Sequence, residues 1–335
     1  MANNRQLYFK LEMLDEFDNV LEEKSGQLES GNVDVASGDI RRRATLRLIE
    51  PLDKEWQGRR WKLYYGYREG KAGEPQYYAQ GVFIPINPNE SEDAGGRITD
   101  LQGVDKTKLF SDYQLPDPVL FASGTPVRDV VIQIAGWVSE TKLLLDADLG
   151  TLGADFTFEE AKTATQLLNE LVGSFNAEWF YDVNGYLVAR KRTDPKTRPV
   201  KYVMDDITTP LYLTSQYNID DGNYYNKVTL TGGTVDTPIY RADVQDDVAI
   251  AKAKRVVSRT YKHDAAVTQA QVDALAAYYL SQGVSLPSRI RLSSLVLPDI
   301  EIDDILVKEG KRYEIKSFSI PLSVIEQRIE AVEIL

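Results

Sequence analysis

The sequence of 335 residues contains no cysteine. A chain without cysteine has no disulfide framework, no cysteine-ligated metal and no cysteine nucleophile. The absence fits assembly in a reducing cytoplasm. The length is enough for two or three packed domains of roughly 150 residues each.

Long apolar runs are also absent. A membrane-spanning helix needs roughly 18 consecutive apolar residues, and the longest candidate, residues 130–138, is short and interrupted by Gln133. The opening residues, MANNRQLYFKLEMLDEF, are not a secretory signal because they include early acids and no apolar segment. We therefore expect no membrane insertion.

Positive charge is in short supply. Lys and Arg total 39 against 51 Asp and Glu, which gives a net charge of −12 at pH 7. An acidic protein repels the phosphate backbone of nucleic acids. We therefore expect no nucleic-acid binding, whether general or sequence-specific.

Combinations of catalytic residues are scarce. The single histidine, His263, has no recognisable nucleophile or second histidine as a partner, which favours a structural or solvated role. No glycine-rich phosphate loop is present. The acidic clusters lack calcium-loop spacing and are typical of turns or solvated edges; they lie at 15–18, 146–148, 205–206, 220–223 and 303–304. The sequence predicts no catalytic residue, no metal site and no cofactor, and no cluster is singled out as the facing carboxylate pair of a glycosidase.

Against this acidic background, SGDIRRRATLRLIEP (37–51) concentrates arginine. Its apolar residues share one parity and Arg41, Arg43 and Arg47 share the other, as in a strand with one core face and one polar face. Only Arg42 falls on the apolar side. The polar face is either solvated or a contact surface for an acidic partner or neighbouring subunit, for which arginine is the best-suited cation. Arg41, Arg43 and Arg47 are the candidate interface residues.

Residues 5–110 are β-rich throughout. RRWKLYYGYREGKAGEPQYYAQGVFI predicts two strands joined by a loop at 70–75. INPNESEDAGG predicts a polar loop before a short strand, RITDLQGVD. Exposed aromatic residues on a concave face would instead favour carbohydrate binding, and the residues available for it are Trp56, Trp61, Tyr64, Tyr65 and Tyr67.

Helical periodicity begins after residue 111. Thr125 is the predicted N-cap of one helix, with Pro126 at the first helical position. A second helix is predicted over 159–175. Asn184-Gly185 then predicts a type I′ hairpin turn.

The last third returns to strands. RTDPKTRP is a charged linker, and strands are predicted around Gly232-Gly233. A third helix is predicted over 268–282, because Thr268 and Gln271 have the spacing of a capping box. The closing strands turn at EGKR, with Gly310 at positive φ.

These patterns predict an α+β, predominantly β protein with three domains, at 1–110, 111–199 and 200–335. The order of features resembles the tail hub (baseplate hub) proteins of tailed bacteriophages and phage-like particles. Four stretches carry the likeness: GNVDVASGDIRRRATLRL; GVFIPINPNESEDAGGRITDLQGVDKTKLF; GTPVRDVVIQIAGWV with ATQLLNELVGSFNAEWFYDVNGYLVAR; and LPDIEIDDILVKEGKRYEIKSFSIPL.

The resemblance implies two tail-tube-like β-barrel domains with an inserted helix-plus-hairpin domain; the last domain would carry one helix. It implies a structural, non-enzymatic homotrimer that forms a ring at the distal end of a tail tube and adapts the six-fold tube to a three-fold spike. The implied partners are the tail tube or distal tail protein, a central spike or tail-tip protein, and the tape-measure protein. The implied location is the virion tail or baseplate, assembled in the host cytoplasm.

The resemblance suggests a role for the net negative charge in the channel of the ring. An acidic lumen would let the genome or the tape-measure protein pass without sticking. Arg41, Arg43 and Arg47 would lie away from that lumen, at a subunit or tube contact. A receptor- or carbohydrate-binding tail-tip component and a cell-wall hydrolase are the alternatives.

Overall fold

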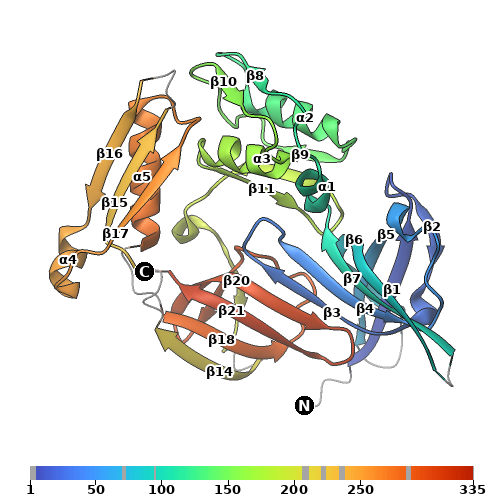
Figure 1. Ribbon diagram of the computed structural model, residues 1–335. Coiled ribbons are helices and arrows are strands. Elements are labelled where there is room, and N and C mark those ends of the chain that lie inside the picture. The colour runs from blue at the N-terminus through green and yellow to red at the C-terminus, as the bar shows by residue number, and fades with distance from the viewer. Residues whose placement is uncertain are drawn as a thin grey trace.

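The computed structural model describes residues 5–69, 73–93, 96–205, 211–219, 224–233, 238–283 and 288–334 (Figure 1). Strands predominate and helices gather in two places, so the predicted α+β, predominantly β class is confirmed. The loop positions 70–72, the acid Asp206, the acidic cluster 220–223 and the segment after Gly233 lie outside the described residues.

The two β-rich ends of the chain join in one sheet. The first end supplies β1 Arg5–Leu14, β2 Val20–Glu23, β3 Leu28–Ala36, β4 Arg42–Leu48, β5 Arg60–Glu69, β6 Gln76–Asp93 and β7 Gly96–Asp105. The second supplies β13 Val200–Val203, β14 Tyr212–Ile219, β18 Ser288–Leu295, β19 Ile305–Lys308, β20 Lys311–Pro321 and β21 Glu326–Glu333. Among the described residues these thirteen strands run β14-β18-β21-β20-β3-β4-β7-β6-β5-β1-β2, with β19 on β20 and β13 on β19.

The joint is the antiparallel pair β3–β20, where Val33 lies opposite Ile320 and Val35 opposite Phe318. One hydrophobic cluster runs through both ends, because apolar side chains of the two halves contact the same core. We expected two barrel domains; within the described residues the two β-rich halves are hydrogen-bonded side by side in one sheet.

The middle of the chain has a core of its own. Its elements are α1 Thr107–Asp112, β8 Val119–Phe121, α2 Val127–Trp137, β9 Leu143–Leu145, β10 Phe156–Phe158, α3 Ala164–Gly173, β11 Ala177–Tyr181 and β12 Leu187–Lys191. The apolar stripes of α2 and α3 are buried against each other and the small sheets, as their periodicity predicted.

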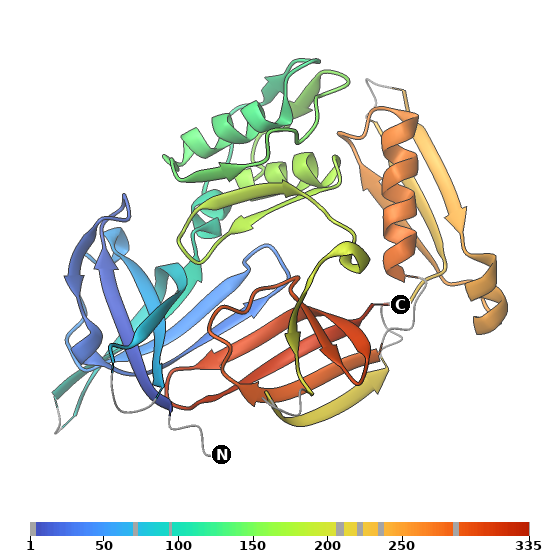
Figure 2. The same ribbon diagram turned by 180° about the vertical axis from the view of Figure 1, so that it is seen from behind.

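A further unit lies within the range expected for the second β domain. Its elements are β15 Lys227–Gly232, β16 Tyr240–Gln245, α4 Asp247–Ala253, β17 Ser258–His263 and α5 Gln269–Gly283. Val228 and Leu230 pack on Val272 and Leu275 in a separate hydrophobic cluster. We call this unit, residues 224–283, the insertion; it carries two helices where one was expected. Figures 1 and 2 show it beside the middle part, on the same side of the large sheet.

Several local predictions are confirmed. The third helix is α5, and the Gln271 amide donates to Thr268 Oγ1 at 3.3 Å. The turn between β19 and β20 has positive φ at both Glu309 and Gly310, as a two-residue type I′ turn requires.

Helix starts and one turn differ from prediction. The first long helix, α2, begins at Val127 with Pro126 as N-cap, one residue later than expected. The second, α3, begins at Ala164, since Thr163 and Gln166 form a capping box that outweighs the acidic residues before it. The type I′ turn at Asn184-Gly185 is wrong: only Gly185 has positive φ, and the Asp182 carboxylate accepts from the amides of Asn184 and Tyr186.

The predicted polar loop at 86–96 is largely strand. β6 runs on to Asp93 and pairs with β7 beyond an irregularity between Ile86 and Asn89, where Asn87 takes a positive φ of 45°. A two-stranded arm with both faces in water needs no apolar alternation, so the sequence pattern gave no signal. No helix among the described residues is long and apolar enough to cross a membrane.

Candidate functional site

The arginine-rich segment is a two-faced strand, as predicted. Along β4, side chains alternate between buried and exposed, with Arg43 and Arg47 on the exposed face. Arg42 is on the apolar side and is 1% exposed. The arginines of β4 therefore lie in two environments: Arg42 is in the core, and Arg43 and Arg47 are on the exposed face.

Arg42 ties the two β-rich halves together from inside. Its amide donates to Asp105 Oδ2 at 2.9 Å, and its Nη1 donates to the Gln80 carbonyl at 3.1 Å. Its Nη2 pairs with Glu301, on the loop before β19. Burial raises the pKa of Asp105, and its hydrogen bonds to Thr107 and the Arg42 amide oppose that rise. A buried cation of this kind is tolerated because its charge and most of its donors are satisfied.

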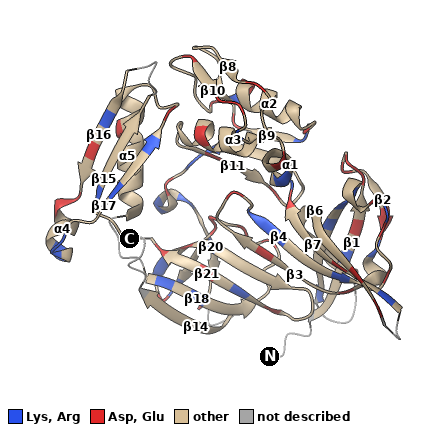
Figure 3. Ribbon diagram, viewed as in Figure 1, with Lys and Arg blue, Asp and Glu red and all other residues tan. Residues whose placement is uncertain are grey.

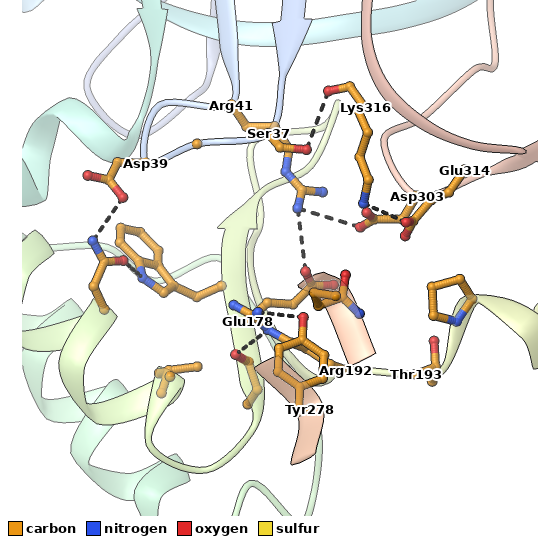
Figure 4. Close-up of a pocket in the computed structure, with 18 of the residues that line it drawn as sticks. Ser37, Asp39, Arg41, Glu178, Arg192, Thr193, Tyr278, Asp303, Glu314 and Lys316 are labelled. Carbon is orange, nitrogen blue, oxygen red and sulfur yellow. Dashed lines mark hydrogen bonds and ion pairs between the residues drawn. The ribbon is translucent and has the colours of Figure 1, made fainter. Parts of the chain in front are cut away.

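Arg41 lies at a junction of the sheet with the middle part. Its Nη2 is 3.7 Å from Glu178 on β11 and 3.8 Å from Asp303 on the loop before β19. Its guanidinium also lies 3.7 Å from the centre of the Phe180 ring. Arg190 shares the same two carboxylates, at 2.7 Å and 3.4 Å. The side chain of Arg41 is thus fully engaged within its own chain (Figure 4).

A cavity of about 320 Å³ opens beside Arg41, where the large sheet, the middle part and the insertion meet. Residues 192–198, the linker between the middle part and β13, run along it, and Arg192 Nη1 donates to Tyr278 Oη of α5 at 2.9 Å. Arg198 and Lys316 both pair with Glu314 of β20, at 2.7 Å and 2.5 Å. Figure 4 shows Arg192 directed at Tyr278, and Lys316 directed at Glu314, around the opening. An adjoining cavity of about 560 Å³ shares Arg192, Tyr278, Glu314 and Lys316 and extends to β21.

The acidic side chains at this junction are paired with basic ones. Glu178, Asp303 and Glu314 line the cavity, and each faces one or more guanidinium or ammonium groups. No group of three or more His, Asp or Glu side chains among the described residues is placed to hold a metal ion. The ion pairs join the large sheet to the middle part and to the linker, and the Arg192–Tyr278 hydrogen bond reaches the insertion.

A second ionic junction joins the first β-rich end to the middle part. Lys106 Nζ lies 3.0 Å from Asp18 and 2.6 Å from Glu140, and it donates to the Gly185 carbonyl at 3.0 Å. Arg60 pairs with the other oxygen of Asp18 at 2.6 Å. Burial alone would raise the pKa of Asp18, but Lys106 and Arg60 outweigh it and hold that pKa below its usual value. The sequence placed Asp18 only in an acidic turn, since its partner Lys106 is distant in the chain.

His263 has the structural role that its isolation indicated. Its Nε2 is 2.8 Å from Tyr279 Oη, and its ring stacks on the Tyr279 ring. Burial lowers the pKa of His263, and the nearby Arg192 adds to that effect. The ring therefore packs against α5 of the same unit, and its lowered pKa favours the neutral form.

The three candidate interface arginines are not brought together. Arg41 is buried at the junction, whereas Arg43 and Arg47 lie on the outer face of the sheet. Arg47 pairs with Glu29 at 2.8 Å and approaches Asp100 at 3.6 Å. No ion partner of Arg43 is found within the described part of the chain.

The aromatic residues of β5 do not make an open platform. Trp61 and Tyr65 belong to the core. Tyr67 stacks on Tyr78, and Tyr64 Oη donates to Glu12 at 2.8 Å. The face that carbohydrate binding would need is thus largely committed to packing.

No family model and no curated protein matches the sequence. Solved structures do match it over nearly its full length. The tail protein from Neisseria meningitidis MC58 has a TM-score of 0.71 at 13% identity, covering 98% of this chain and 96% of that one. The fold is that of phage tail proteins.

Two further solved structures are similar to this chain over nearly its full length. The 43 kDa tail protein of prophage MuSo2 from Shewanella oneidensis has a TM-score of 0.67 at 14% identity, covering 97% of this chain and 98% of that one. A chain of the lidded Francisella PdpA-VgrG complex has a TM-score of 0.59 at 9% identity, covering 98% of this chain and 53% of that one. The likeness includes the middle part and the insertion as well as the large sheet, because the coverage is nearly complete.

Proposed function

We infer that the protein is a structural hub of a phage tail or phage-like particle: a homotrimeric ring at the distal end of a tail tube. In this role the ring lines the channel for the genome or tape-measure protein and adapts the six-fold tube to a three-fold spike. It holds a shape and catalyses no reaction. The full-length likeness to tail proteins supports this assignment.

The observation that carries the proposal is the β3–β20 pair. It sets the two β-rich ends side by side in one sheet, so each chain presents two adjacent β modules. Three chains would present six such modules, which is the number a six-fold tube offers. A three-copy ring could then match the tube at every position while keeping three-fold symmetry towards a spike.

The ion pairs at the two junctions are consistent with a structural protein whose domains keep a fixed arrangement. Arg41 with Glu178 and Asp303, and Lys106 with Asp18 and Glu140, are shielded from water and therefore little screened by salt. Breaking one partner of a buried pair leaves an uncompensated charge, so the junctions resist opening.

The proposed partners follow from the ring. One face contacts the tail tube or distal tail protein, and the other receives a central spike or tail-tip protein; the likeness to a chain of the PdpA-VgrG complex supports a partner of that kind. The net charge of −12 keeps the passage unattractive to nucleic-acid phosphates.

Electron microscopy of the purified chain tests this function. The expected particle is a ring with three-fold symmetry, a central hole and six similar lobes around it. Zymography on bacterial cell wall is the companion measurement, with no cleared band expected. Particles without a hole, or a cleared band, would contradict the hub.

A further inference from the structure

We propose that two surfaces at opposite ends of the molecule bind each other between copies of this chain, α4 of one copy docking on the β1–β2 end of the next. This inference rests on the proposed function, since it names the contact that would close the ring.

The first surface, the acidic edge, consists of Glu16, Phe17, Val20, Leu21, Glu22 and Glu23. Phe17 is 65% exposed and Val20 58% exposed. Every residue of β2 is exposed, and among the described strands β2 pairs with β1 alone. An open strand edge that carries large apolar side chains is a site for association.

The acidic edge is held in place rather than loose. The Asp15 carboxylate accepts from the amides of Phe17 and Asn19, at 2.9 Å and 2.8 Å, which fixes the turn. Asp18 points the other way, into the buried cluster with Arg60 and Lys106. The contacts of Asp15 and Asp18 therefore hold the turn in one conformation while Phe17 stays exposed. A contact surface that is ordered before binding has this property.

The second surface, the basic helix end, consists of Val248, Lys252, Lys254, Arg255 and Val256. Val248 is 79% exposed and Val256 57% exposed. None of the seven residues of α4 is buried. So short a helix is marginal by itself; the Asp246 carboxylate caps its first turn at Ala249 N, and Lys254 ends it in the left-handed region.

Helix electrostatics explain only part of the second surface. Cations near the C-terminal end of a helix offset its dipole, which accounts for Lys252 and Lys254 without any partner. The dipole gives no reason for Val248 and Val256 to be exposed beside them. A surface that combines exposed apolar and basic side chains is complementary to one that combines exposed apolar and acidic side chains.

The acidic edge is such a surface. Two copies that each carry a net charge of −12 repel each other over most orientations. Attraction needs a basic area on one copy to meet an acidic one on the other. Arg47 is already paired with Glu29, whereas Lys252 and Lys254 have no ion partner within the described residues.

Position completes the match. In both views α4 and β2 lie at opposite ends of the molecule (Figures 1 and 2). Figure 3 shows acidic positions at the start of α4, basic positions towards its end, and acidic positions along β2. Two different surfaces at opposite ends make a head-to-tail contact, which closes a ring when the rotation between copies returns to the first copy and otherwise repeats into an open chain.

Cross-linking tests the contact directly, because the chain has no cysteine of its own. Leu21→Cys and Val248→Cys are made as separate full-length variants, mixed and oxidised under mild conditions. We expect a disulfide between the two variants and little product from either one alone. Leu120→Cys replaces Leu21→Cys in the matched control, since Leu120 is 60% exposed on the middle part. Equal cross-linking of the control, or none with Leu21→Cys, would overturn the proposal.

Charge reversal gives the second readout. Lys252→Glu with Lys254→Glu should weaken self-association about tenfold or more, and adding Glu16→Lys with Glu23→Lys should restore most of it. Lys108→Glu with Arg291→Glu makes the same change in net charge elsewhere and should leave self-association within about threefold. A control as weak as the test variant would assign the effect to net charge and contradict the contact.

The two proposals fail separately. A three-copy ring that forms without the Leu21–Val248 cross-link keeps the hub and overturns this contact. A cross-link in open chains or pairs that never close at three copies upholds the contact and counts against the hub.

Discussion

Val33 of β3 lies opposite Ile320 of β20, and both side chains are fully buried. This pair joins the first and last β-rich segments of the chain. The middle part and the insertion are built from the residues between them, so the order of the polypeptide makes two adjacent β modules out of its two ends. The core at this joint determines whether the two modules behave as one rigid unit.

Truncating Ile320 tests the joint. Ile320→Ala should lower the free energy of unfolding by about 2–5 kcal/mol, because it removes buried methyl groups and leaves a cavity. Chemical denaturation measures the loss. Val324→Ala is the control, since Val324 is 47% exposed, and it should stay within about 0.5 kcal/mol. Equal effects would show that β3–β20 is not part of the cooperative core.

Lys106 tests the buried ionic junction. Lys106→Met should cost about 3–5 kcal/mol of unfolding free energy, because Asp18 and Glu140 would lose the buried cation they share. Lys108→Met breaks only the more exposed pair with Asp112 and should cost about 0.3–0.5 kcal/mol. Thermal unfolding of both variants separates the two cases. A Lys106 variant as stable as its control would mean that the junction contributes nothing.

Glu170 gives a pH dependence. This residue of α3 is near Asp264 of the insertion, and burial, with Asp264 adding to it, raises the pKa of Glu170 despite the opposing Lys162 and Lys262. A raised carboxyl pKa means that the folded state disfavours the ionised carboxylate. The ionised Glu170 therefore lowers the free energy of unfolding at pH values above its folded pKa, and this destabilisation disappears as the pH falls through that pKa.

Glu170→Gln should therefore raise the free energy of unfolding at pH 7. The variant and the natural chain should converge below about pH 4, where the carboxyl is protonated in both states. Glu159→Gln is the control, because Glu159 is largely exposed. A Gln variant that is less stable at pH 7 would contradict this reading of the contact between α3 and the insertion.

The arginine face of β4 remains a predicted contact. Arg43→Glu with Arg47→Glu should leave the fold within about 0.5 kcal/mol, because both side chains are exposed, and should block ring or tube assembly. Arg41→Glu should instead destabilise the chain, because Arg41 is buried between Glu178 and Asp303. Normal particles from the Arg43–Arg47 double variant would eliminate the contact.

Sequence patterns predicted the features that depend on neighbouring residues in the chain. The alternation along β4 placed Arg42 inward, and the capping residues located α5, because strand faces and helix caps depend on neighbours in the sequence. The predicted hairpin forms between β11 and β12, but its type I′ turn was wrong, because the Asp182 side chain, only two residues before Asn184, reorganised the turn.

Longer-range features left no such signal. Lys106, Asp18 and Glu140 come from three distant segments, and nothing in their local sequence marks them as partners. Arg41 shares its parity with Arg43, yet the turn before β4 carries it into the interior. The separate core of the insertion depends on Val228 meeting Val272 across the chain, so it too could only be seen in three dimensions.

Native mass spectrometry of the full chain tests the trimeric hub most directly. The predicted result is a stable species at three times the 37.8 kDa chain mass, with no pairs or tetramers. A monomer at every concentration, or a stable species of another copy number, would contradict the ring.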